Sequence, residues 1–190
     1  GKEDGAFIVV LAQSPTELVN EGAILKHCVG RMGYDKKMAR EESLILMSIM
    51  TYYADQILDG TKGFEFRKSP LRISDLNKTI YLYSAKGDKS ITGSFKVKKI
   101  HHGNVQEIMQ ITGYDKRRDG HEILEYYRNA RNCYALELYD VQRFPEPLTL
   151  KQLRRLDPNI QLPQYFTYIR PSSPVYRAIK ELSSQVALQK

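Results

Sequence analysis

The chain has 190 residues, of which 42% are hydrophobic and 27% charged, so its composition is typical of a globular protein and excludes a disordered one. Its formal net charge of +7 makes a polyanion such as nucleic acid a natural partner. Two cysteines exclude a disulfide-rich scaffold, and no apolar run approaches the roughly 18 residues of a membrane span, so we expect a cytoplasmic protein without a membrane partner.

The first predicted elements are a strand and a helix. The apolar residues 7–12 predict a short buried strand and are too few for the core of a secretory signal. Ser14 and Glu17 form a capping box with Pro15 at the first helical position, which predicts a helix over residues 15–26.

A strand-rich body follows. Residues 44–50 predict a central strand, and residues 52–58 a short helix that Gly60 ends. Three further strands are predicted over residues 62–67, 79–85 and 90–100. Because Gly87 and Asp88 supply turn residues, we expect the last two strands to form a hairpin.

The strand over residues 90–100 has one apolar and one polar, basic face. The apolar set is Ile91, Gly93, Phe95 and Val97, and the polar set is Thr92, Ser94, Lys96 and Lys98. A glycine inside a strand indicates a bulge or a close approach of another segment, and we expect one of these at Gly93.

The late elements are mostly helical. Helices are predicted over residues 105–111 and 120–128, a strand over 133–141, a basic helical turn over 150–156 and a helix over 174–188. Val175, Ile179, Leu182 and Val186 form one stripe of the last helix, which should pack on the body or on a protein partner.

Residues 47–170 resemble an ASCH domain, a member of the PUA-like group, through motifs that occur in the family's order. These motifs are MSI (47–49), YADQILDG (53–60), TKGFEFR (61–67), IYLYSA (80–85), ITGSF (91–95), YALEL (134–138) and LPQYF (162–166). The resemblance implies an α+β fold, a PUA-like small β-barrel with peripheral helices, here preceded by an N-terminal strand-helix piece. We therefore divide the chain into residues 1–46, an ASCH domain at 47–170, and a C-terminal amphipathic helix at 171–190.

Residues 21–30 (EGAILKHCVG) resemble a segment of PcfJ-like proteins, which occur on conjugative and other mobile elements. The resemblance implies that residues 1–46 are a PcfJ-like segment and that the protein comes from a mobile element or a phage. It implies no chemistry.

Lys62, Glu65 and Arg67 are the main candidates for a ligand site. Glu65 and Arg67 are two apart on a predicted strand and so share a face. Lysine and arginine can contact a phosphate or a base edge, and a carboxylate can accept from an exocyclic amine. By spacing alone the cluster is more typical of an exposed ion pair than of a ligand site. The ASCH resemblance implies that it lies in the ligand groove and that the ligand is RNA, another single-stranded nucleic acid or a modified nucleotide.

Other residues extend the predicted binding surface. The binding set is completed by Arg72, Ser84, Lys96 and Lys98. A longer phosphate track would include Lys99, Lys116, Arg117, Arg118, Lys151, Arg154 and Arg155, although these are also typical of a solvated basic surface. Tyr81, Tyr83, Tyr114, Tyr127 and Tyr134 are candidates to stack on unpaired bases, although most tyrosines at strand spacing simply pack.

Two enzymes on the same groove remain as alternatives, with Lys62 and Glu65 as candidate catalytic residues. Some ASCH proteins are amidohydrolases that pair a lysine with a threonine three residues later and with a later glutamate; here Glu65 occupies the threonine position, and the glutamate candidates are Glu107 and Glu137. Others are ribonucleases, and a cluster of lysine, glutamate and arginine suits that chemistry. A protein-interaction module that uses the N-terminal helix and the C-terminal stripe is a further alternative.

We expect no metal and no cofactor. His27 and Cys28, and likewise His101 and His102, are adjacent pairs without a further ligand at zinc-finger spacing. Neighbouring side chains diverge in regular structure, so we interpret Cys28 as a buried structural cysteine and not as a nucleophile activated by His27.

Overall fold

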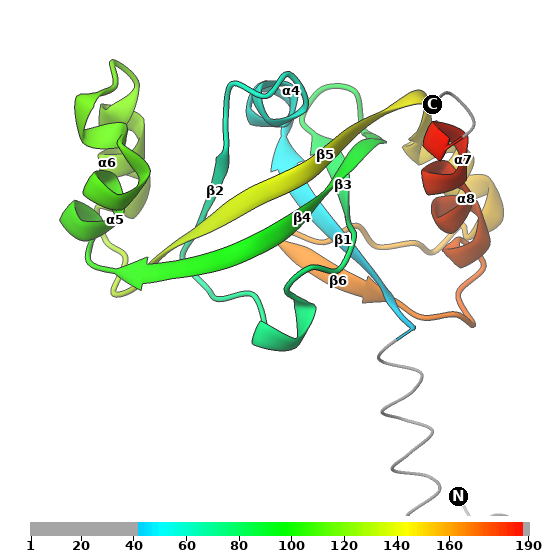
Figure 1. Cartoon of the computed structure of the whole chain (residues 1–190). Coiled ribbons are helices and arrows are strands. Elements are labelled where there is room, and N and C mark those ends of the chain that lie inside the picture. Colours follow the sequence, from blue (N-terminus) through cyan, green and yellow to red (C-terminus); the bar gives the residue numbers. More distant parts are fainter. Residues whose placement is uncertain (1–41, 188–190) are drawn as a thin grey trace, which may run out of the picture. The chain divides into compact units, whose positions relative to one another are not determined.

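The computed structural model describes residues 42–187, and the strand and helix predicted over residues 7–26 lie outside this range. The described strands are β1 (Leu44–Met50), β2 (Phe64–Arg67), β3 (Ile80–Ala85), β4 (Ser90–Gly103), β5 (Cys133–Thr149) and β6 (Phe166–Ile169) (Figure 1). The helices are α4 (Thr51–Leu58), α5 (Val105–Thr112), α6 (Gly120–Tyr127), α7 (Leu150–Leu156) and α8 (Tyr176–Ala187), with two 3-10 helices, η1 (Ile73–Asp75) and η2 (Tyr114–Lys116). The prediction of an α+β fold is confirmed.

The six strands form one mixed sheet in the order β2-β5-β4-β3-β1-β6. β1 and β3 are parallel, and every other pair is antiparallel. β2 and β6 are the edges, so hydrogen bonds between strands do not close this sheet into a barrel. Figure 1 shows α5 and α6 at one end of the sheet and α7 and α8 at the other.

Local sequence signals explain most elements. Gly60 follows α4 with φ +77°, a left-handed conformation that glycine adopts without strain. The predicted hairpin is the antiparallel pair β3 and β4. The close approach expected at Gly93 is confirmed, because a Cβ there would collide with the Gln142 carbonyl oxygen and the Leu58 side chain.

β5 and β6 differ from the predictions. β5 continues to Thr149, well past the predicted end at residue 141, even though it contains Pro145 and Pro147. The prolines are tolerated because β2 pairs only with the first part of β5, and because the β4–β5 register shifts between Ile91 and Gly93. β6 was not predicted as a strand, since it has only four residues and its pairing with β1 is not a local signal.

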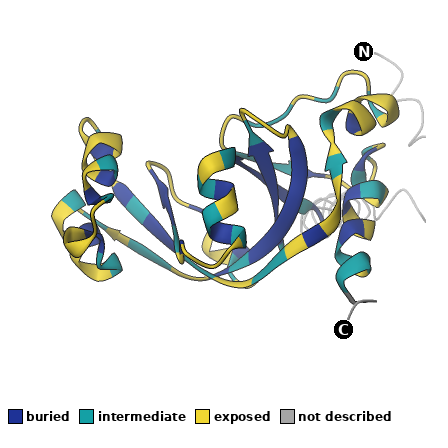
Figure 2. Cartoon of the chain, turned by 90° about the horizontal axis from the view of Figure 1, so that it is seen from above, coloured by how far each residue is buried: buried dark blue, intermediate teal, exposed yellow. Residues whose placement is uncertain are grey.

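The buried residues form three clusters, and Figure 2 shows them concentrated in the strands and on the inward sides of the helices. One cluster lies between the sheet and α4, and another joins α5 and α6 to β2 and the start of β5. The third cluster includes Val175, Ile179 and Leu182, so the predicted C-terminal stripe packs on the body.

Candidate functional site

Lys62, Glu65 and Arg67 meet in a buried ionic cluster. Their exposed fractions are 4%, 7% and 8%, which excludes the exposed ion pair that the spacing alone allowed. The Lys62 ammonium lies 2.5 Å from one Glu65 oxygen, and Arg67 Nη2 lies 3.1 Å from the other. One carboxylate therefore holds two cations, and the cluster keeps a net positive charge.

The backbone fixes each member of this cluster. The amide of Lys62 donates to the Gln56 carbonyl oxygen at 3.0 Å, which ties the residue to the end of α4. Glu65 and Arg67 lie on the same face of β2, opposite Leu136 and Tyr134 of β5. The spacing in the sequence therefore placed the pair on β2 correctly, and the turn after α4 brings Lys62 to it.

The Arg67 side chain also connects β2 to β1, two strands that are not hydrogen-bonded to each other in the sheet. Its Nη2 donates to the carbonyl oxygen of Ser48 on β1 at 2.9 Å, although β2 and β1 are not paired as strands. The Arg67 Nε is buried and has no hydrogen-bond partner among the described residues. A buried donor without a partner is costly, so this group can favour a ligand that brings an acceptor.

A cavity of about 290 Å³ opens beside this cluster. It is lined by Ser48, Ile49, Met50, Tyr53, Lys62, Glu65, Phe66, Arg67, Glu122, Ile123, Tyr126, Gln164 and Tyr165. These residues come from β1, α4, residues 62–67 in and just before β2, α6, and the two residues before β6. The cavity therefore lies between β2 and the β1–β6 pair, which are not joined by strand hydrogen bonds.

Burial lowers the pKa of the Lys62 ammonium below its usual 10.5, and the positive charge of Arg67 acts in the same direction. The charge and hydrogen bond of Glu65 oppose this effect. Burial outweighs the carboxylate because the ammonium loses nearly all its water. The Lys62 ammonium also lies 5.4 Å from the ring centres of Tyr53 and Phe66, where cation–π attraction partly replaces that water.

Tyr53 and Glu122 form a second polar pair in the cavity. The Tyr53 hydroxyl donates to Glu122 Oε2 at 2.9 Å and so links α4 to α6. Burial, together with the bond to the Glu122 carboxylate, raises the pKa of Tyr53 to about 12. The hydroxyl therefore stays protonated at neutral pH and remains a donor.

Four other predicted binding residues lie elsewhere, and none lines this cavity. Arg72 stacks on the Tyr168 ring at 4.9 Å, and Ser84 donates to Thr51 Oγ1 at 2.9 Å beside the start of α4. Lys96 pairs with Asp140 at 2.9 Å and Lys98 with Glu137 at 3.4 Å. The structure thus brings together the first three predicted residues and separates the rest.

Besides Glu65, the glutamate that lines the cavity is Glu122, and not either of the two later glutamates chosen from the sequence. Glu107 caps the start of α5, where its side chain accepts from the Asn104 amide at 2.8 Å. Glu137 contacts Lys98 and His101 outside the cavity. Glu122 was missed because its contact with Tyr53 joins residues 69 apart, which no local spacing reveals.

The tyrosines predicted to stack on bases are mostly core residues. Tyr81, Tyr83, Tyr114 and Tyr127 are buried, as the alternative that most of these tyrosines simply pack had allowed. Tyr134 is half-buried, and its ring stacks on His102 with centres 4.6 Å apart. Tyr126 and Tyr165, at the rim of the cavity, are instead 37% and 52% exposed.

The histidines at positions 101 and 102 contact different partners. His101 lies 3.2 Å from Glu137, and His102 lies 3.2 Å from Asn132. Across residues 42–187, no three histidine, cysteine or acidic side chains gather in a way that could hold a metal ion. No helix in the same range is both long and apolar enough to cross a membrane.

The chain is similar to a curated ASCH domain-containing ribonuclease from Zymomonas mobilis, with 27% identity over 147 residues that cover 77% of this chain and 95% of the relative. The crystal structure of ASCH from the same organism aligns with a TM-score of 0.60 and 26% identity, covering 76% of this chain and 93% of that chain. A serine-to-alanine variant aligns with a TM-score of 0.63 and 25% identity over 74% of this chain and 97% of that chain. The predicted ASCH resemblance and PUA-like fold are confirmed.

Two family models match overlapping parts of the sequence. The model of PcfJ-like protein matches residues 1–61, which confirms the resemblance found over residues 21–30 and extends it into β1 and α4. The second model begins at residue 43 and covers more than half of the chain. The chain belongs to the family described as Domain of unknown function (DUF365), whose model matches residues 43–156.

Proposed function

We propose that this protein binds single-stranded RNA and that one nucleotide enters the cavity beside Lys62, Glu65 and Arg67. The observation that carries the proposal is the buried cluster with its unused Arg67 Nε donor at the wall of the cavity. Buried cations are costly unless they are paired, and here one carboxylate serves two of them. A ligand with a negative charge or with several hydrogen-bond acceptors would supply the missing partner for Arg67 Nε and balance the second cation.

The size and rim of the cavity favour a single nucleotide. Its volume of about 290 Å³ is at the small end of ligand pockets, which suits one base and not a duplex. Tyr126 and Tyr165 offer exposed rings at the rim, and such rings stack on unpaired bases of any sequence. The carboxylates of Glu65 and Glu122 can accept from an exocyclic amine, so a base that carries such an amine fits best.

The likeness to a ribonuclease supports RNA over DNA as the ligand. In single-stranded RNA the unstacked bases can be splayed out and read one at a time, which matches a small cavity better than a groove.

The test is the affinity of a mixed-sequence single-stranded RNA for the wild type and for Lys62→Gln and Arg67→Gln. We expect each variant to bind at least about tenfold more weakly, because a charged hydrogen bond to the ligand is worth roughly 1.5–3 kcal/mol. Lys98→Gln, which alters an exposed ion pair outside the cavity, is the matched control. Wild-type affinity in both cavity variants, with their fold verified by circular dichroism, would refute the site.

Cleavage of the bound RNA is the second candidate function, and the lowered pKa of Lys62 favours it. In this reaction the ribose 2′-oxygen bonds to phosphorus, its proton passes to a base, and the bond from phosphorus to the 5′-oxygen breaks as that oxygen takes a proton from an acid. Lys62 would act as the base after its ammonium has lost a proton, the protonated Tyr53 hydroxyl suits the acid, and Arg67 can stabilise the phosphate charge. The products are a 2′,3′-cyclic phosphate and a 5′-hydroxyl.

Product analysis separates the two functions. Mass spectrometry of RNA incubated with the wild type would detect the cyclic phosphate if the chain cleaves RNA, and Lys62→Gln should abolish it. Binding without any product assigns the chain as a recognition protein. Amide hydrolysis has less support, because Glu65 stands where the lysine–threonine pattern needs a hydroxyl and is itself bonded to Lys62.

We further propose that residues 1–46 form a PcfJ-like segment that precedes the ASCH domain and that the protein belongs to a mobile element. The family match that begins at residue 43 supports this division, as does the compact unit that begins at Ser43 and includes α8. Limited proteolysis of the full chain should cut before this unit and leave residues 43–190 intact. Cleavage within residues 47–170 at the same rate would contradict the division.

A further inference from the structure

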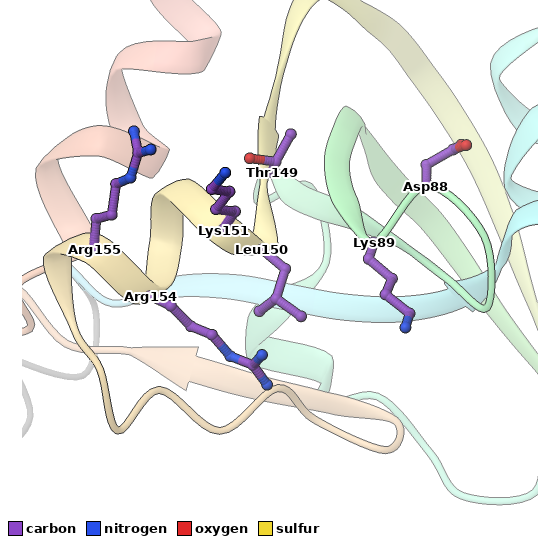
Figure 3. Close-up of a pocket in the computed structure, with 7 residues that line it drawn as sticks. All are labelled: Asp88, Lys89, Thr149, Leu150, Lys151, Arg154 and Arg155. Carbon is purple, nitrogen blue, oxygen red and sulfur yellow. The ribbon is translucent and has the colours of Figure 1, made fainter.

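A second and larger cavity, of about 560 Å³, lies at the end of the sheet that carries α7. It is lined by Asp88, Lys89, Thr149, Leu150, Lys151, Arg154 and Arg155 (Figure 3). Four of these seven residues are cationic and one is acidic. The surface around this cavity is therefore strongly positive.

The four cations of this cavity form no ion pair with an acidic side chain among the described residues, in contrast to Lys96, Lys98 and Arg143. Lys96, Lys98 and Arg143 each pair with a carboxylate within 3.4 Å. Within residues 42–187, no such ion pair involves Lys89, Lys151, Arg154 or Arg155. The Asp88 carboxylate is instead within 3.4 Å of the Ser84 hydroxyl.

The spacing along α7 increases the mutual repulsion of these cations. Lys151 and Arg155 are four residues apart and so are neighbours on the helix surface, where like charges are unfavourable. Figure 3 shows their side chains on one side of α7, whereas those of Lys89 and Arg154 extend on the other side with Leu150 between them. The charges thus form two rows, which suits an extended polyanion better than a single small anion.

The patch is held in place by the fold. Thr149 and Gln152 form a capping box that sets the start of α7, and Leu153 is fully buried in the core. The Leu150 amide donates to the Lys89 carbonyl oxygen at 2.7 Å, which joins α7 to the turn between β3 and β4. The backbone that carries the cations is therefore fixed before any ligand arrives, so binding does not have to order this part of the main chain.

We propose that Lys89, Lys151, Arg154 and Arg155 form a second RNA site, which binds the phosphates of the strand whose nucleotide occupies the first cavity. This inference rests on the proposed function. The second site gives affinity without base selection, because it offers charge and few groups that can read a base edge. A membrane surface is a poorer match, since an interfacial helix presents a broad apolar face and α7 buries Leu153 in the core.

The test compares two single-stranded RNAs, one of four nucleotides and one of about 20, on the full chain. The short RNA can place one nucleotide in the first cavity, and only the long RNA is expected to contact both sites. In the double variant Lys151→Gln/Arg155→Gln we expect affinity for the long RNA to fall about tenfold. The slope of log K against the logarithm of the salt concentration should become less negative by about 1.4, which corresponds to the loss of two phosphate contacts on a single strand. Affinity for the short RNA should be unchanged.

The control is Arg131→Gln/Lys180→Gln, which removes the same charge from exposed residues outside both cavities and outside the predicted binding surface. If the control lost as much affinity for the long RNA as the α7 variant, the loss would come from net charge alone, and the inference would be overturned. Unchanged binding of the long RNA by the α7 variant would overturn it while leaving the proposed function intact. If the wild type bound neither RNA, both would fail, and binding to vesicles that contain phosphatidylserine would then assign the patch to a membrane.

Discussion

The Lys62 ammonium lies 2.5 Å from the Glu65 carboxylate at a place where both side chains are buried. Arg67 occupies the other oxygen of the same carboxylate. Glu65 is thus the single negative charge that keeps two cations within the protein. This arrangement makes the stability of the domain and the ionisation of Lys62 depend on one residue.

Replacing Glu65 by glutamine should lower the free energy of unfolding by about 3–5 kcal/mol at neutral pH, because it leaves two buried cations without a counter-charge. The loss should shrink as the pH rises towards 10.5. In the folded variant Lys62 has a lowered pKa and binds fewer protons than in the unfolded chain, so stability increases with pH over that window. Urea unfolding at pH 7 and at about pH 9.5 measures both effects.

The matched control for this substitution is Glu137→Gln. Glu137 also contacts two basic side chains, Lys98 and His101, but at a more exposed place, so its loss should cost about 0–1 kcal/mol. Similar losses for the two variants would mean that the buried cluster is no more important than a surface pair.

The ionisation of Lys62 can be followed directly by NMR of the lysine side-chain amines. Lys62 should titrate below 10.5 because it is buried, and Lys96 above 10.5 because the carboxylate of Asp140 bonds to it. Arg67→Met should raise the pKa of Lys62, since the charge of Arg67 lowers it, and Glu65→Gln should lower it further. If Lys62 titrated together with Lys96, the burial argument would be wrong.

The sequence predicted the elements whose signals are local and missed those that depend on distant contacts. The hairpin of β3 and β4, and the helices α4 to α8, follow from turn residues, caps and apolar periodicity. β6 has four residues and exists because it pairs with β1, more than a hundred positions earlier in the chain. Its pattern alone is too short to distinguish a strand from a loop.

The same distinction applies to the site. Lys62, Glu65 and Arg67 are close in sequence, and a family resemblance was enough to select them. Tyr53 and Glu122 join the cavity through a contact between α4 and α6, and the position of α6 follows from packing against β2 and β5. The burial of Tyr81 and Tyr83 depends on Phe144, Leu153 and α8, and that of Tyr114 and Tyr127 on Phe66 and α5, all contacts that local spacing does not reveal.

Gly93 offers a test of the fold that leaves the site untouched. Gly93→Ala should lower the free energy of unfolding by about 1–3 kcal/mol, because its Cβ would collide with the Gln142 carbonyl and the Leu58 side chain. Gly63→Ala is the control, since nothing lies within 4 Å of a Cβ at that position, and it should change stability by about 0.5 kcal/mol or less. Thermal unfolding of both variants decides the point, and equal stabilities would contradict the close packing of α4 against β4 and β5.

The exposed tyrosines at the rim test whether a base stacks there. Tyr126→Ala and Tyr165→Ala should each weaken binding of single-stranded RNA, by about 1–3 kcal/mol for every base that stacks. The phenylalanine variants should bind like the wild type, because stacking uses the ring and not the hydroxyl. Tyr52→Ala is the control, since Tyr52 is 60% exposed on α4 but does not line the cavity. Fluorescence anisotropy with a labelled RNA gives the affinities, and full affinity in both alanine variants would remove the rim from the RNA path and restrict recognition to the buried cluster.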